Sequence, residues 1–173
     1  STHPGEDEVI AAAIPPGALL IVAPRHPARG EAVAAALDGP RRSGNEPVTA
    51  DTRVYVADTL GEMGLFYSLA DVAVMGGGFV PGVGGHNPLE PARLGVPVTS
   101  GPAVFNFAEV YEAMAQAGAA LVVEASGLKA TLADLLDNAD RREAMSKAAL
   151  GFANRSAHAL DDTWAQLQRL LPA

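Results

Sequence analysis

Short apolar runs alternate with amphipathic segments along the chain. The run 18–23 is continuously apolar and stops at Pro24, which is typical of a strand buried on both faces. Similar runs predict further strands at 53–57, 71–75, 96–99 and 119–123. Helices are predicted at 29–37, 61–69, 88–94 and 107–117, and over 128–171 with an interruption near 138–140.

Strands that alternate with helices at this spacing predict βαβ units and a parallel sheet. Right-handed crossovers then give an α/β fold, a Rossmann-like doubly wound parallel sheet with helices on both faces. The length of 173 residues predicts a single domain, 1–173, and no internal repeat or linker divides it. In such folds ligands bind beyond the carboxyl ends of the strands, so those ends are where a site is expected.

Composition and charge narrow the possible partners. Hydrophobic residues make up 49% of the chain and charged residues 18%, which indicates a globular protein. The net charge of -8 argues against nucleic acid and anionic membrane surfaces as partners. The absence of cysteine excludes disulfides and cysteine-based zinc sites, and no histidine pair has metal-ligand spacing, so no metal is predicted. No apolar run approaches the ~20 residues of a spanning helix, so a cytoplasmic domain is expected.

The strongest local signal is the run from Gly84 to Pro91, Gly-Gly-His-Asn-Pro-Leu-Glu-Pro. Glycines before a helix start allow backbone N–H groups to approach an anion, and the helix N-terminus adds partial positive charge. Glu90, one turn into the helix, is placed to accept both hydroxyls of a ribose. The alternative is an ordinary capping box formed by Asn87 and Glu90.

Two further segments follow predicted strands. In Pro24-Arg25-His26-Pro27, the planar guanidinium of Arg25 can bind a phosphate or a base edge, although a solvated arginine is an equal alternative. Gly61-Glu62-Met63 opens a helix whose free N–H groups can hold a base or phosphate. Its alternative is plain capping, with the Met63 side chain in the core.

Other features of the sequence limit these interpretations. Ser1 to Glu6 looks like a loop and helix cap without the strand that should precede it, so we expect the chain to be part of a larger protein. The common dinucleotide glycine fingerprint and the Walker lysine motif do not occur. Trp164 is interpreted as a core residue or as a contact with another domain.

These motifs together resemble bacterial 3-deoxy-D-manno-octulosonic acid (Kdo) transferase. The resemblance runs in order from Ser1 to about Val123, and its most specific part is the run from Gly84 to Pro91. It implies the C-terminal half of a GT-B glycosyltransferase, a domain that binds CMP-Kdo and releases CMP. The N-terminal acceptor domain, absent from this chain, would bind the lipid A precursor and carry the catalytic carboxylate.

The resemblance also implies which residues contact the donor. The expected binding residues are Pro24, Arg25, Gly61, Glu62, Met63, Gly85, His86, Asn87, Pro88, Leu89 and Glu90. No catalytic residue is expected in this chain, which alone would be inactive, and no cofactor or metal is implied. The parent enzyme is expected at the cytoplasmic face of the bacterial inner membrane. The alternatives are a GT-B donor domain for another nucleotide sugar, or a non-catalytic nucleotide-binding module.

Overall fold

The fold is described from a computed structural model over residues 1–168. Each predicted apolar run contains or overlaps a strand, and every strand pair is parallel, as predicted. The strands are β1 (Leu20–Val22), β2 (Val54–Val56), β3 (Ala73–Met75), β4 (Val98–Ser100) and β5 (Ala120–Val122). The helices are α1 (Glu6–Ala13), α2 (Gly30–Leu37), α3 (Met63–Leu69), α4 (Leu89–Ala92), α5 (Ala108–Gln116), α6 (Ala125–Asp137) and α7 (Ala139–Gln168), with 3-10 turns at Pro27–Arg29 and Phe105–Phe107.

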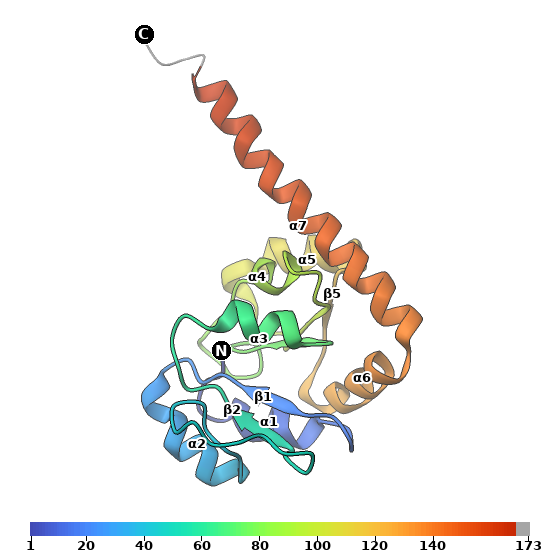
Figure 1. Cartoon of the computed structure of the whole chain (residues 1–173). Helices are drawn as coiled ribbons and strands as arrows, with labels where there is room; N and C mark the ends of the chain where they lie inside the picture. Colours follow the sequence, from blue (N-terminus) through green and yellow to red (C-terminus); the bar gives the residue numbers. More distant parts are fainter. Residues whose placement is uncertain (169–173) are drawn as a thin grey trace.

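The strands form two sheets that lie side by side (Figure 1). β1 pairs with β2, and β3, β4 and β5 form the second sheet in that order. Residues of both sheets, including Val22 of β1 and Val74 of β3, pack into one apolar cluster. The two sheets therefore share a core, with the open edges of β1 and β3 facing each other.

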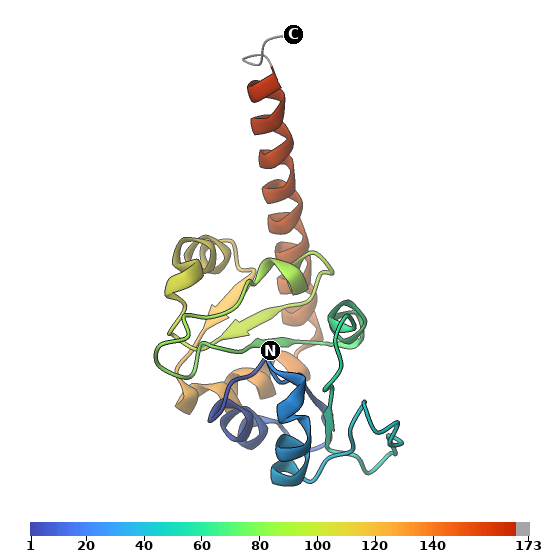
Figure 2. The same ribbon diagram turned by 90° about the vertical axis from the view of Figure 1, so that its left-hand side faces the viewer.

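Helices cover both faces of the strands. On one face, α1, α2 and α6 pack against Leu20 and Val22. On the other, α3 packs near Ile21, while α4, α5 and α7 pack around Met75 and Val98. Alternate strand residues point to opposite faces, so the central strands contact helices on both, while Val122 at the end of β5 is exposed. This arrangement confirms the predicted doubly wound α/β fold (Figure 2).

Two expectations about the helices are corrected. α4 has only four residues, fewer than predicted, because residues 93–95 close into tighter turns in which the Leu94 N–H donates to Pro91 and the Gly95 N–H to Ala92. Trp164 lies on α7, which extends away from the sheets (Figure 1), and its side chain is 55% exposed. The interpretation of Trp164 as a core residue is therefore wrong. No helix among residues 1–168 combines the length and apolar character that crossing a membrane requires.

Candidate functional site

The predicted segments follow three neighbouring strands. Residues 24–25 follow β1, residues 61–63 follow β2 at the start of α3, and residues 85–90 follow β3 and lead into α4. Because the strands are parallel, all three segments lie at the carboxyl edge, where doubly wound folds bind ligands.

A buried carboxylate anchors the loop that follows β3. Glu6, at the start of α1, is fully buried. Its carboxylate accepts hydrogen bonds from the backbone N–H groups of Gly77 (2.7 Å), Phe79 (2.9 Å) and His3 (3.0 Å). These charge-assisted bonds satisfy the buried acid and fix the N-terminal loop against the segment that leads to residues 85–90.

Gly84 and Gly85 bend this loop. Their φ angles are 89° and 76°, in the left-handed region that glycine enters without strain. The Gly85 N–H donates to the carbonyl of Gly77 at 3.0 Å, and Gly85 is buried. We expected this amide to face a phosphate. In the structure it instead points into the protein, where it is bonded to Gly77. Gly85 contributes by shaping the loop.

Two histidines meet where this loop contacts the N-terminus. The Nε2 atoms of His86 and His3 are 2.9 Å apart, and the rings stack with centroids 5.1 Å apart. The Tyr111 hydroxyl donates to the His86 carbonyl at 3.0 Å, which fixes the backbone. Burial, aided by the positive charges of the N-terminus and Arg25, lowers the pKa of His86 to about 4. Burial also lowers the pKa of His3.

His3 was missed as a candidate site residue. The two histidines are 83 positions apart in the sequence, so no spacing rule connects them. The only available signal was the position of His3 in a loop directly before a predicted helix cap.

The helix start at residues 87–90 has a cap but little dipole. The Asn87 side-chain oxygen accepts the Leu89 N–H at 3.0 Å, which confirms the predicted cap. Pro88 is buried and has no N–H. A helix as short as α4 sums few peptide dipoles, so the positive end expected here is weak. Glu90 is exposed, and its charge adds to burial in raising the pKa of Tyr67 on α3.

Arg25 supplies accessible positive charge at this edge. Its backbone N–H donates to the Thr2 carbonyl at 2.9 Å, and its side chain is exposed. Arg29 is paired with Asp7, and Arg42 with Glu62. Arg25, by contrast, pairs with no acidic side chain in the part of the chain that the structure describes.

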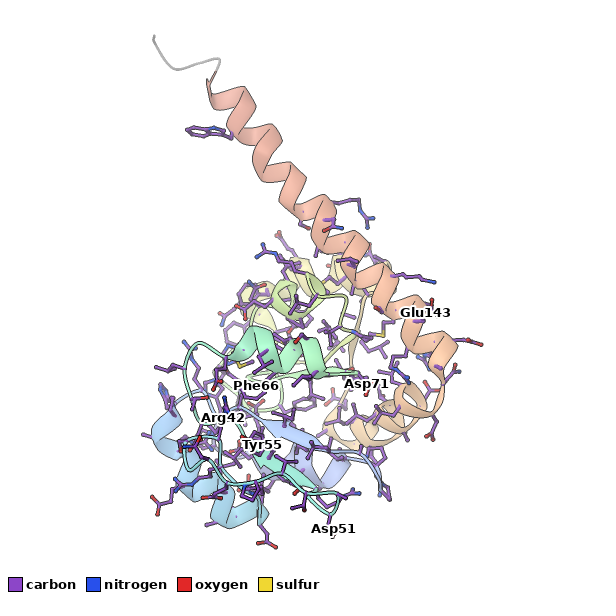
Figure 3. The ribbon with its side chains drawn as sticks, viewed as in Figure 1. Arg42, Asp51, Tyr55, Phe66, Asp71 and Glu143 are labelled. Carbon is purple, nitrogen blue, oxygen red and sulfur yellow. The ribbon has the colours of Figure 1, made fainter. Side chains whose placement is uncertain are left out.

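The start of α3 is organised by an ion pair that sequence spacing did not reveal. The Arg42 guanidinium donates to the Glu62 carboxylate at 2.7 Å, and the Thr59 hydroxyl donates to the same carboxylate. The bond from Arg42 is the main cause that lowers the pKa of Glu62 to about 2. Arg42 and Tyr55 lie beneath α3 (Figure 3). The Glu62 carboxylate is thus already bonded to Arg42 and Thr59. Beside it, Met63 is half-buried and Gly61 is exposed.

The site therefore combines an exposed guanidinium, an exposed carboxylate and a rigid loop with a histidine pair. This combination suits an anionic ligand that also carries hydroxyls. Among the side chains that the structure describes, no cluster of three or more histidine or acidic residues is arranged to hold a metal ion.

Comparisons with known proteins relate the chain to one family. No protein-family model matches it. It is 38% identical, over 86% of its length, to the 3-deoxy-D-manno-octulosonic acid transferase of Haemophilus influenzae, and 36% identical over 94% of its length to that of Bordetella pertussis. The chain spans only 38% and 43% of these relatives.

A solved structure covers the same region. The crystal structure of the C-terminal CMP-Kdo binding domain of WaaA from Acinetobacter baumannii matches with a TM-score of 0.81 and 33% sequence identity. The match covers 88% of this chain and 85% of that domain. A putative UDP-N-acetylglucosamine 2-epimerase from Listeria monocytogenes, at 18% identity and a TM-score of 0.54, shares the fold alone. The chain belongs to the 3-deoxy-D-manno-octulosonic acid transferase family.

Proposed function

We propose that this chain binds CMP-Kdo and forms the donor half of an enzyme that transfers Kdo to the lipid A precursor in lipopolysaccharide synthesis. The observation that carries the proposal is the 33% identity and TM-score of 0.81 to a CMP-Kdo binding domain, extending over 85% of that domain. The position of the three segments at one sheet edge supports it, because that edge binds ligands in this fold class.

In this proposal Arg25 binds the donor phosphate through its planar fork, and the N–H groups of His86 and Asn87 add hydrogen bonds. Glu90, exposed at the same edge, accepts the ribose hydroxyls. The start of α3 at Gly61 to Met63, where Gly61 is exposed, lies against the base. Gly85, Pro88 and Leu89 hold the turn, since the N–H groups of Gly85 and Leu89 are already bonded within the protein. Arg25 and the amides offset the phosphate charge, and no metal is assigned.

The activity of the whole enzyme needs more than this chain. We assign residues 1–173 to one donor domain, and the catalytic carboxylate and the lipid acceptor site to the remainder of the protein. The chain alone then binds donor without transferring sugar. Because the acceptor is a lipid precursor, the proposal places the whole enzyme at the cytoplasmic face of the inner membrane.

Isothermal titration of the chain with CMP, CDP and UMP tests the donor assignment. We expect CMP to bind and UMP to bind at least about tenfold more weakly, since a site that hydrogen-bonds one base edge leaves groups unpaired with another. Equal affinity for CMP and UMP would indicate a donor domain for another nucleotide sugar. Absence of heat with every nucleotide would contradict the proposal and favour a module without a working site.

A matched pair of variants tests the role of Arg25. Arg25→Ala removes a charge-assisted hydrogen bond of ~1.5–3 kcal/mol, so we expect CMP affinity to fall about 10- to 150-fold. Arg155→Ala removes an exposed arginine from α7 and is the control for net charge. Equal affinities of the two variants would remove Arg25 from the site.

A further inference from the structure

Arg42 lies in a segment that joins the outer edge of β2. The Arg42 N–H donates to the Val56 carbonyl and the Val56 N–H donates to the Pro40 carbonyl, both at 2.9 Å. These bonds form a parallel bridge on the edge of β2 that faces away from β1. Residues 40–42 are thereby fixed beside the segment in which the chain leaves β2.

Two successive residues hold the chain that follows β2. The Ser43 N–H and hydroxyl donate to the buried carboxylate of Asp58 at 2.8 and 2.6 Å. The Arg42 guanidinium donates to both carboxylate oxygens of Glu62, from Nη2 at 2.7 Å and from Nε at 3.1 and 3.2 Å. A planar guanidinium that contacts both oxygens fixes the direction of a carboxylate as well as its position. The turn 59–61 between these two acids is thus held at both ends.

The middle of this turn is exposed. Leu60 is 82% exposed, and Gly61 has a φ angle of 81°, where an added Cβ would meet nothing within 4 Å. The Thr59 hydroxyl donates to the Glu62 carboxylate, so this bond also depends on where that carboxylate lies. Because glycine permits many backbone conformations, the shape of the turn depends on how Glu62 is held.

The turn borders the candidate donor site. Val22 of β1 and Val56 of β2 are register partners, and Arg25 and Thr59 each follow their strand by three residues. Chains that leave neighbouring parallel strands start about 4.8 Å apart. The bond from Arg42 lowers the pKa of Glu62 to about 2, so this carboxylate is ionised at neutral pH. A negative charge therefore lies at the edge that is proposed to bind an anion, and Arg42 offsets it.

We propose that Arg42 is a positioning residue for the nucleotide: its guanidinium holds and neutralises the Glu62 carboxylate, and so fixes the turn 59–61 against the base. The inference rests on the proposed function, which places the start of α3 against the base. Arg42 acts through Glu62 and not by contact with the ligand. Without Arg42, the turn loses its outer attachment, and an uncompensated negative charge repels the anionic ligand.

Arg42→Ala and the matched control Arg141→Ala test the proposal in the ligand-free chain. Arg141 pairs with Asp134 between α6 and α7, so each variant loses one arginine and one ion pair. Nitrogen-15 relaxation gives the order parameters of the backbone amides. We expect those of Leu60 and Gly61 to fall from about 0.85 to below about 0.6 in Arg42→Ala and to keep their wild-type values in Arg141→Ala. Unchanged order parameters in Arg42→Ala would overturn the proposal.

Titration with CMP and UMP tests the effect on binding. Arg42→Ala should weaken CMP binding about tenfold and narrow the ratio of CMP to UMP affinity about threefold or more, because a loose turn discriminates poorly between base edges. Arg42→Lys keeps the charge without the planar fork and should be intermediate. In a Glu62→Ala background, Arg42→Ala should change CMP affinity by less than about twofold, since its partner is already absent.

The binding results separate this inference from the proposed function. If wild type binds CMP and Arg42→Ala binds it equally tightly, this inference alone is refuted. If the losses of the two single variants multiply in the double variant, Arg42 contacts the nucleotide directly and is not a positioning residue. A wild-type chain that binds no nucleotide contradicts the proposed function and this inference with it.

Discussion

At the scale of single residues, the burial of His3 and His86 makes stability depend on pH. The pKa of both side chains is lowered in the folded state, mainly by burial, and that of His86 reaches about 4. The unfolded chain, with an ordinary histidine pKa of about 6.5, therefore binds more protons between these values. The histidines contribute their full stability above pH ~6.5, and this contribution is lost as the pH falls towards 4.

We expect wild-type stability to fall between pH 7 and pH 5, and His86→Gln to remove about 1–2 kcal/mol of that fall. Urea unfolding followed by circular dichroism at both pH values measures this. His26→Gln is the matched control, because His26 is exposed and follows β1. If His86→Gln keeps the full wild-type dependence on pH, the burial of His86 is not the origin of the acid sensitivity.

At the scale of elements, the sequence predicted those features that depend on residues close together in the chain. Buried parallel strands are continuously apolar, so 18–23 and 71–75 indicated β1 and β3 correctly. Asn87 was recognised as a cap because a cap depends on residues only two or three positions apart. The exact end of α4 was missed, because residues 93–95 continue as tighter turns that sequence periodicity does not distinguish from a helix.

Contacts between distant elements could not be predicted in this way. Arg42 and Glu62, 20 positions apart, meet only because β2 brings their segments together. The inward direction of the Gly85 amide likewise depends on the Gly77 carbonyl, which the fold places opposite it.

The close approach of the segments that follow β3 and β4 gives a prediction about stability at this scale. Gly101, directly after β4, lies so near the loop after β3 that a Cβ would overlap the Gly78 carbonyl. That carbonyl accepts the Ala103 N–H at 3.0 Å and cannot easily move. We expect Gly101→Ala to destabilise the protein by about 1–3 kcal/mol, by forcing the two segments apart.

The control for this substitution is Gly127→Ala on α6, where an added Cβ would meet nothing within 4 Å. Alanine favours helix formation over glycine, so this variant should gain about 0.5–1 kcal/mol. Urea unfolding of both variants measures the difference. Two variants of equal stability would show that the approach of Gly101 to Gly78 is not tight in solution.

At the scale of the whole molecule, the protein is acidic although its candidate ligand is an anion. The net charge is -8, while Arg25 presents an exposed positive charge at the candidate site. The distant charges act at long range, where salt screens them strongly, whereas Arg25 acts within a few ångströms of a bound phosphate. Approach and retention of a nucleotide should therefore respond differently to ionic strength.

We expect the association rate of CMP to rise by a factor of about 2 or more between 10 and 200 mM salt, because screening removes the repulsion between the acidic protein and the nucleotide. Stopped-flow mixing with a fluorescent CMP analogue measures this rate. Asp51→Lys combined with Glu124→Lys replaces two exposed acids and changes the net charge from -8 to -4, so its rate should depend less on salt. A wild-type association rate that falls with salt would mean that the local field of Arg25 already dominates the encounter. Repulsion by the acidic surface would then have no part in setting how fast the nucleotide binds.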